Sequence, residues 1–217
     1  MLGWAREFLS QPWPFLTLAT LAVVGVLVHR PLARRLGWAR WPTLAMLLGA
    51  AAVAALTLPP APVGTGVPLA PGVSVSGPDA AVTTACIRSL TDPAVLWSGL
   101  VTVDSLGERV GNVAMFVPLA FCTVLAVRRP VLATGLLLLA PAGVELAQAV
   151  TGLGRECVGY DWVNNATGVL LGAAAGGVVT VAWRMVGSGR GSSRTDRSGG
   201  PGRSGPVSSR RSRRSSR

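Results

Sequence analysis

Five long apolar segments dominate the hydrophobic pattern of the chain, and the regions outside them hold nearly all of the charged residues. A membrane-spanning helix needs roughly 17–25 mostly apolar residues, which is close to the length of each segment. The segments are residues 13–28, 41–58, 112–127, 131–150 and 165–186. The pattern therefore predicts an all-α fold, a polytopic transmembrane helix bundle of about five spans.

Composition supports a membrane protein. Of the 217 residues, 50% are hydrophobic and 13% are charged, against about 25% charged in ordinary globular domains. A soluble chain of this composition would expose large apolar patches, so ordinary soluble enzymes are disfavoured. The first apolar segment ends in His29-Arg30-Pro31 without the small-residue cleavage pattern of a signal peptide, and we expect it to be a retained helix.

The distribution of Arg predicts the orientation of the spans, because short cytoplasmic loops are enriched in basic residues. Arg outnumbers acidic residues in residues 29–40, in the loop at 128–130 and in residues 187–217, where nine Arg face one Asp. Residues 59–110 and 151–164 mix both signs of charge. This pattern places the N-terminus outside the cell and the C-terminus inside.

Four regions follow from these assignments. Residues 105–186 form a three-helix core, whose first helix is expected to begin near Ser105, where Ser105 and Glu108 fit a capping box. The other regions are two N-terminal transmembrane helices (1–58), an extracytoplasmic Pro/Gly-rich loop that is extended at its start (59–104) and a cytoplasmic tail (187–217).

The tail, residues 187–217, is rich in Arg, Ser and Gly and cannot bury a core, so we expect it to be disordered. Its favoured partner is anionic lipid of the inner leaflet. Nucleic acid is the alternative partner, but the tail lacks the aromatic residues that stack on bases.

Two of the three cysteines lie in regions predicted to face outward. An oxidising exterior permits a disulfide between Cys86 and Cys157, and two unpaired thiols are the alternative. Cys122 lies inside the third span, where a free Cys packs as a small apolar residue. The only histidine is His29, at the predicted inner end of the first span, so no metal site or cofactor is expected.

Polar residues inside or beside three of the spans form the main anomaly. Ionisable groups within a span are rare and commonly face a bundle interior or a polar cavity. The candidate polar residues fall near the outer ends of the last three spans. This placement predicts an outward-facing polar pocket that binds membrane lipid or an envelope ligand. Its candidate residues are Asn112, Glu145, Gln148, Arg155, Asp161 and Asn165. The alternative for Glu145 is a protonated side chain that only holds two helices together.

Three glycines follow at intervals of four in the last span: Gly168, Gly172 and Gly176. Such spacing forms a smooth groove that lets another helix approach closely. Packing against the third or fourth span is favoured, and dimerisation is the alternative.

Two blocks of residues resemble the VanZ-like family of bacterial membrane proteins. The first is residues 112–119 (NVAMFVPL), similar to the family's N-x-x-x-F-x-P-[LG] block. The second runs from Glu145-x-x-Gln148 through Arg155 to Asp161-x-x-x-Asn165-x-x-Gly168-x-x-x-Gly172. The resemblance covers about residues 108–178 and departs from the family at Ala120, where Gly is common.

The resemblance implies a multi-pass protein of the bacterial plasma membrane and cell envelope. The family takes its name from a protein associated with resistance to the glycopeptide teicoplanin, which implies a lipid-linked envelope precursor or a glycopeptide as a further candidate ligand.

Three functional hypotheses follow. The favoured one is binding of a lipid headgroup, envelope precursor or glycopeptide without covalent chemistry and without a catalytic residue. The second is a membrane enzyme for a lipid-linked substrate, with Glu145 and Asp161 as general acid and base; the outer regions hold no His, and there is no G-x-S-x-G elbow. The third is a scaffold whose tail binds a cytoplasmic partner.

Overall fold

The computed structural model describes residues 10–59, 80–102, 106–151, 157 and 159–191. All regular secondary structure in this part of the chain is helical. Five helices are long and apolar enough to cross a membrane: α2 (Pro12–Leu36), α3 (Arg40–Thr57), α6 (Leu106–Ala126), α7 (Pro130–Thr151) and α8 (Gly159–Gly191). The predicted all-α bundle of about five spans is therefore confirmed.

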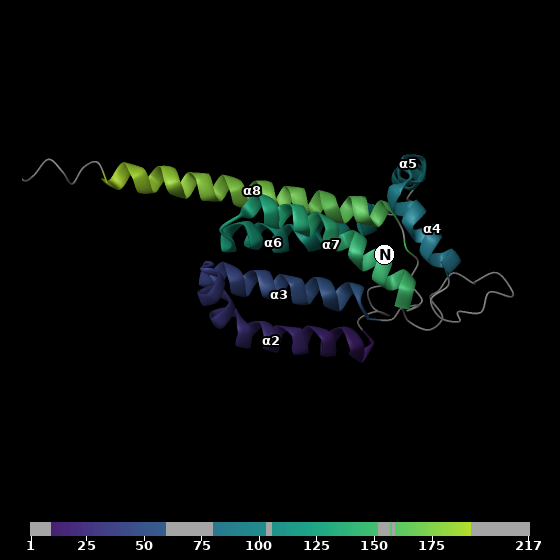
Figure 1. Ribbon diagram of the computed structural model, residues 1–217, viewed down its shortest axis with the longest axis horizontal. Helices are drawn as coiled ribbons and strands as arrows, with labels where there is room; N and C mark the ends of the chain where they lie inside the picture. The colour runs from purple at the N-terminus through teal and green to yellow at the C-terminus, as the bar shows by residue number, and fades with distance from the viewer. Residues whose placement is uncertain (1–9, 60–79, 103–105, 152–156, 158, 192–217) are drawn as a thin grey trace, which may run out of the picture. The chain divides into compact units, whose positions relative to one another are not determined.

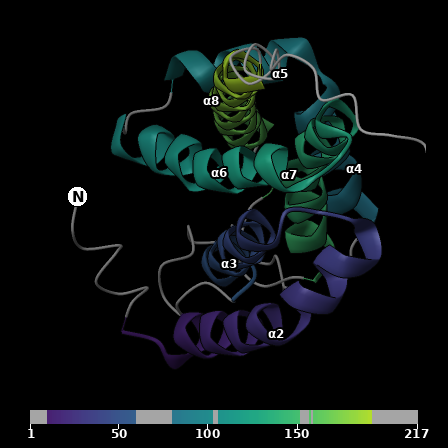
Figure 2. The same cartoon turned by 90° about the vertical axis from the view of Figure 1, so that its left-hand side faces the viewer.

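The chain divides into two compact units, residues 1–180 and residues 181–217. In the first unit α2 packs against α3, α3 against α6, and α6 against α7. Figures 1 and 2 show α3 between α2 and the α6–α7 pair, with α8 on the other side of that pair. The second unit contributes the end of α8, from Val181 to Gly191.

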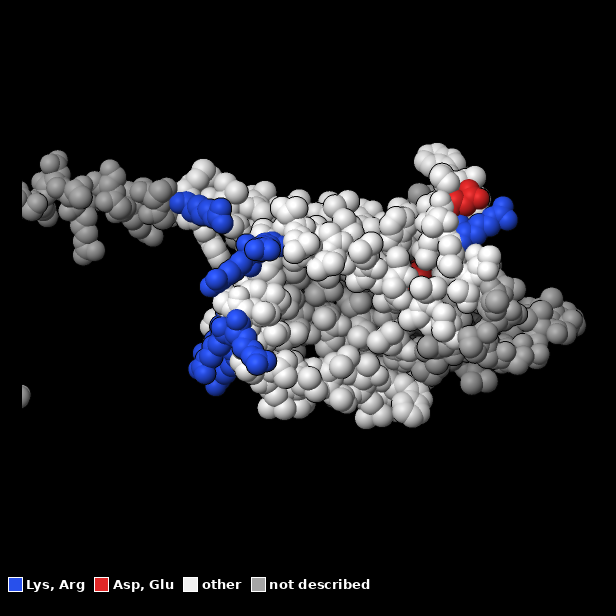
Figure 3. Space-filling model, viewed as in Figure 1, with Lys and Arg blue, Asp and Glu red and all other residues white. Residues whose placement is uncertain are grey.

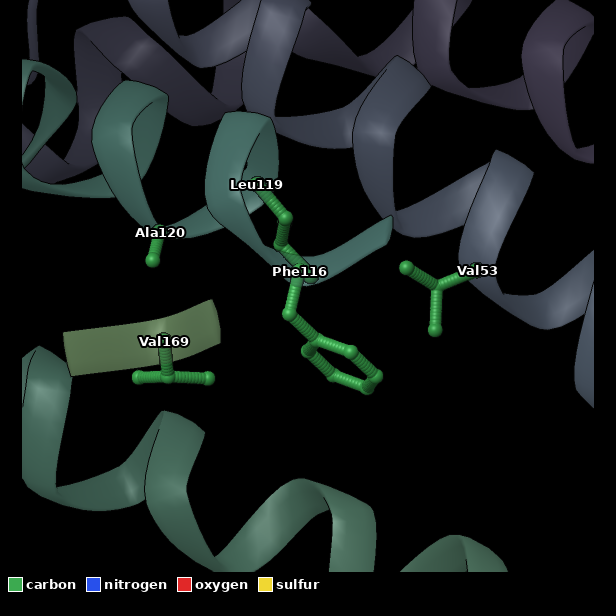
Figure 4. Close-up of a cluster of buried hydrophobic side chains, with 5 residues drawn as sticks. All are labelled: Val53, Phe116, Leu119, Ala120 and Val169. Atoms are coloured by element: carbon green, nitrogen blue, oxygen red, sulfur yellow. The ribbon is translucent and has the colours of Figure 1, made fainter. Parts of the chain in front are cut away.

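A small apolar core joins three of these helices. It consists of Val53 from α3, Phe116, Leu119 and Ala120 from α6, and Val169 from α8 (Figure 4). Close contact needs small residues here, because a Cβ at Gly49 of α3 would lie 3.3 Å from the Cα of Leu119.

Outside the core, large apolar side chains point away from the bundle. Leu27 is 70% exposed and Val131 is 87% exposed. In a bilayer these side chains face lipid, which is as apolar as they are. On the face drawn in Figure 3, Arg side chains gather beside the α2–α3 turn, charges of both signs gather beside α4 and α5, and the surface between them is largely uncharged. This is the charge pattern of a multi-pass membrane protein.

Helix α2 is longer than the predicted span at 13–28. It continues to Leu36 and contains Arg30, Pro31, Arg34 and Arg35, which the sequence analysis assigned to a loop. Cations are favourable in the last turn of a helix because of the helix dipole. The helix ends at Gly37, whose φ of 64° is the left-handed conformation that glycine adopts readily.

Two short helices, α4 (Ala80–Thr91) and α5 (Pro93–Thr102), lie in the region 59–104 that the sequence predicts as a loop. Asp92 separates them and caps α5, since its Oδ1 accepts a hydrogen bond of 2.9 Å from the Ala94 N–H. Pro93 follows at the first helical position, where proline is favourable. Helix α4 packs against both α7 and α5. The Pro/Gly-rich stretch 60–79 lies outside the described residues.

Two predicted boundaries differ from those in the structure by a few residues. Helix α6 begins at Leu106, next to the predicted start at Ser105, although Ser105 itself lies outside the described residues. Helix α8 continues through Gly191, five residues into the tail predicted to begin at Gly187. Residues 192–217 lie outside the described part, so the tail's disorder and its lipid partner stay predictions.

Candidate functional site

A direct hydrogen bond connects the beginnings of α6 and α8. The Nδ2 of Asn112 donates to Oδ1 of Asp161 over 2.6 Å. Hydrogen bonds to a charged acceptor are about twice as strong as neutral ones. Two of the six predicted pocket residues, 49 positions apart in the sequence, are thereby brought together.

One face of α8 continues this polar site into the bundle. Asp161, Asn164, Asn165 and Gly168 follow at helical spacing and share that face. The side chains of Asn164 and Asn165 are 8% and 4% exposed. The first two turns of α8 therefore present amide and carboxylate groups, rather than apolar side chains, to the interior.

Two buried atoms of this face have no hydrogen-bond partner in the part of the chain that the structure describes. The Nδ2 of Asn164 and the Oδ1 of Asn165 make no hydrogen bond to any described residue. A buried polar group left unsatisfied costs about 1–3 kcal/mol, and native proteins keep few of them. A donor and an acceptor on one helix face thus remain available to a further group.

Asn164 was missed by the sequence analysis, which selected Asp161 and Asn165 because they are four residues apart. Asn164 is three residues after Asp161 and four before Gly168, so it satisfies the same facing rule. Its helical spacing from Asp161 and Gly168 was the sequence signal that could have identified Asn164.

Glu145 lies on α7, the neighbouring helix, and is 4% exposed. The same helix is joined to α8 by Trp162, whose Nε1 donates to the carbonyl oxygen of Leu138 over 3.2 Å. A carboxyl group is therefore held inside the bundle on the helix that contacts α8.

The other two predicted pocket residues are not placed. Gln148 belongs to α7, but its side chain is outside the described part, and Arg155 lies in the segment 152–156, which is also outside it. Their membership of the site stays a prediction.

The three glycines of α8 lie directly on α6. A Cβ added at Gly168 would collide with the carbonyl oxygen of Val113, and one added at Gly172 would collide with that of Val117. At Gly176 it would lie 3.0 Å from the carbonyl oxygen of Phe121.

Residue numbers rise together along both helices in this contact, so α6 and α8 run parallel. The register advances by four residues on each helix at every step. The glycine face of α8 is thus occupied by α6, in agreement with the favoured internal packing and not with its use as a dimer surface.

A disulfide bond joins α4 to the segment just before α8. Cys86 of α4 is bonded to Cys157, with a Cα–Cα distance of 5.3 Å across 71 positions of sequence. The hydroxyl of Ser89 donates to the Cys86 carbonyl oxygen over 2.8 Å. Gly159 is in close contact with Ser89, because a Cβ there would collide with the Ser89 carbonyl oxygen. Helix α4 therefore braces the end of α8 that holds Asp161.

An apolar groove runs along the first half of α6. Its volume is about 440 Å³, and its lining consists of Arg109, Val110, Val113, Ala114, Val117 and Pro118. Arg109 contributes a cation at one end, one turn before Asn112. The groove thus combines a long apolar wall with a charged end near the site.

Comparison with known proteins supplies the family. A family model described as VanZ/LLP1 matches residues 67–180, which is more than half of the 217 residues. The matched region includes α4, the disulfide, the polar residues of α6, α7 and α8, and the glycine contact. No curated protein and no solved structure matches the chain. The match to the family model shows that this multi-pass membrane protein belongs to the VanZ/LLP1 family.

Proposed function

We propose that the polar face shared by α6, α7 and α8 binds the polar part of an amphiphilic ligand of the bacterial cell envelope. The residues are Asn112, Glu145, Asp161, Asn164 and Asn165, with Gln148 and Arg155 as further candidates. The observation that carries the proposal is the pair of unpartnered buried atoms, Asn164 Nδ2 and Asn165 Oδ1. They offer one donor and one acceptor to a ligand.

The groove on α6 supports an amphiphilic rather than a water-soluble ligand. It is lined almost entirely by apolar side chains and has Arg109 at one end. An acyl or prenyl chain fits such a wall while a polar or anionic group stays near Arg109 and Asn112. The ligand classes are a lipid headgroup, a lipid-linked envelope precursor and a lipophilic glycopeptide such as teicoplanin.

The site belongs to the extracytoplasmic side of the plasma membrane in this proposal, with the N-terminus outside and the C-terminus inside. Two observations support that orientation. The Cys86–Cys157 disulfide lies at this end of the molecule, and disulfides persist in oxidising compartments. Arg30, Arg34 and Arg128 lie at the opposite end, as the enrichment of basic residues in cytoplasmic loops requires.

The proposed role is binding rather than catalysis. One side-chain oxygen of Asp161 accepts a short hydrogen bond from Asn112, which orients Asp161 as a binding group. A membrane enzyme that uses Glu145 and Asp161 as acid and base is the alternative, and the test below distinguishes the two.

The test is native mass spectrometry of the purified full-length protein with three probes: phosphatidylglycerol, a polyprenyl-linked peptidoglycan precursor and teicoplanin, against phosphatidylcholine as reference. Asn165→Leu removes the polar atoms at similar volume. Thr167→Val is the matched control, since Thr167 lies on the exposed face of α8.

We expect at least one probe to bind in preference to phosphatidylcholine, and Asn165→Leu to weaken that binding about tenfold, the equivalent of one lost hydrogen bond to a charged group. Equal behaviour of the two variants, or no preference for any probe, contradicts the proposal. A mass change of the bound precursor that Glu145→Gln abolishes would establish the enzymatic alternative instead.

A further inference from the structure

We infer that a second site, at the end of the bundle opposite to the polar face, binds a phosphate group. A pocket of about 150 Å³ lies at the α2–α3 turn and is lined by Arg30, Ala33, Arg34, Trp38 and Arg40. Three of these five residues are cations. Guanidinium groups recognise phosphate oxygens through paired hydrogen bonds, so the lining matches a phosphate in charge and in donor content.

Within the described residues, the arginines of this pocket have no acidic partner. Among the acidic side chains that the structure describes, Asp92 lies at the start of α5, Glu145 lies inside α7 and Asp161 lies at the start of α8. None of them is on α2 or α3. Arg30 and Arg34 are one turn apart on α2, where like charges repel each other. A bound anion removes that repulsion.

Helix α3 contributes a second source of positive potential. Its first residue is Arg40, its N-cap is Ala39 without a side-chain cap, and its first turn contains no acidic residue. A helix N-terminus carries a partial positive charge that favours anions. Arg40 therefore adds a full cation where the helix dipole is already positive, and both attract an anion.

The pocket is held in place by a network at the neighbouring α6–α7 turn. Arg128 Nε donates to the Gly37 carbonyl oxygen over 2.8 Å, and the Ala39 N–H donates to the Ala126 carbonyl oxygen over 3.0 Å. The segment that carries Trp38 is thus fixed between two such bonds.

Two tryptophans indicate the level of the membrane. Trp38 lines the pocket, and Trp41 is 67% exposed with the Arg40 guanidinium 5.0 Å from its ring centroid. Tryptophan is enriched at membrane–water interfaces, at the depth of lipid headgroups. The phosphate therefore belongs either to an anionic phospholipid of the leaflet on this side or to a soluble phosphate compound that reaches the interface.

The test is a binding titration of the full-length protein in detergent by native mass spectrometry, with phosphatidylglycerol, phosphatidylcholine and inorganic pyrophosphate as probes. The variant is Arg30→Gln/Arg34→Gln. The control is Arg35→Gln/Arg129→Gln, which removes the same charge from two exposed arginines at this end that do not line the pocket.

Wild type and the control are expected to prefer phosphatidylglycerol to phosphatidylcholine, and the pocket variant to bind it at least tenfold more weakly, as expected for two arginines near an anionic headgroup. Binding of pyrophosphate that depends on the same two arginines assigns the site to soluble phosphates instead of lipid, and equally supports it.

Equal losses in the two double variants, or no preference for either anionic probe, overturn the inference. Arg40→Gln serves as an independent variant on the other helix if the α2 double variant does not fold. The two variants separate the two sites: phosphatidylglycerol binding that is lost in Arg30→Gln/Arg34→Gln but kept in Asn165→Leu belongs to this pocket, and the reverse pattern assigns it to the polar face and overturns the inference.

Discussion

Asn112 Nδ2 lies 2.6 Å from Asp161 Oδ1, and this hydrogen bond joins the first residue of one family block to the second block. Along both helices it is the first of a series of contacts between α6 and α8. The next contacts toward their C-terminal ends are the glycine steps, Gly168 on Val113 and Gly172 on Val117. The polar end and the glycine groove are therefore two parts of one parallel helix pair, and a change in either alters the position of Asn164 and Asn165.

The Asn112–Asp161 bond should show energetic coupling. We expect a double-mutant cycle of Asn112→Ala and Asp161→Ala to give a coupling energy of about 1 kcal/mol. Side-chain hydrogen bonds in membrane proteins contribute somewhat less than this on average, and hydrogen bonds to charged groups contribute somewhat more. The measurement is the free energy of unfolding in mixed micelles. A second cycle with Asn112→Ala and Thr167→Ala, whose side chain is exposed, should be additive; coupling of equal size in both cycles argues against the bond.

A methyl group at Gly172 should disrupt the helix pair. It would collide with the Val117 carbonyl oxygen, whereas a Cβ at Gly177 of the same helix meets no atom within 4 Å. We expect Gly172→Ala to lower the free energy of unfolding by about 1–3 kcal/mol through overpacking. Gly177→Ala should leave it unchanged or raise it by up to about 1 kcal/mol, since alanine is the better helix former. The packing account fails if both variants are equally stable.

The disulfide predicts the thiol content of the native protein. Cys86 and Cys157 are bonded, and Cys122 is a free cysteine. Denatured but unreduced protein purified from membranes should titrate as one thiol per chain, and reduced protein as three. Cys86→Ser/Cys157→Ser should lower stability by about 2–4 kcal/mol, the usual effect of a disulfide that closes a long loop. Three thiols in the unreduced protein would place this end in a reducing compartment.

The proposed orientation is tested by fusions at the C-terminus. With the C-terminus inside, a green fluorescent protein fused after Arg217 should fluoresce, and an alkaline phosphatase fused there should be inactive because it folds only outside the cytoplasm. An active phosphatase fusion would reverse the orientation and move the polar face to the cytoplasmic side.

The sequence predicted the spans well because a bilayer imposes a simple rule, a long apolar helix between charged loops. The rule identifies the spans but locates their ends poorly. The last two turns of α2 were assigned to a loop because Arg30, Pro31 and Arg34 interrupt the apolar run. In the structure these residues are helical. Long Arg side chains can extend to the membrane–water interface, so their charges do not require the helix to end before them.

Helices α4 and α5 were not predicted because they are short and follow a Pro/Gly-rich stretch. Helix α4 is held in place by tertiary contacts, namely the disulfide to Cys157 and its packing on α7. Local sequence propensity predicts neither contact. The candidate site was predicted in large part from polar residues inside spans. Asn164 and the α2–α3 pocket were not predicted, because burial of an amide and the meeting of Arg30 with Arg40 both require the fold.

The most direct test of the binding site is a crystal structure of the full-length protein grown from a lipid phase, with attention to Asn164 Nδ2 and Asn165 Oδ1. We expect ordered non-protein density within hydrogen-bond distance of both atoms, continuous with density in the groove beside Val113 and Val117. A map in which each amide is bonded to the protein or to one isolated water, with no space for a larger group, would contradict it.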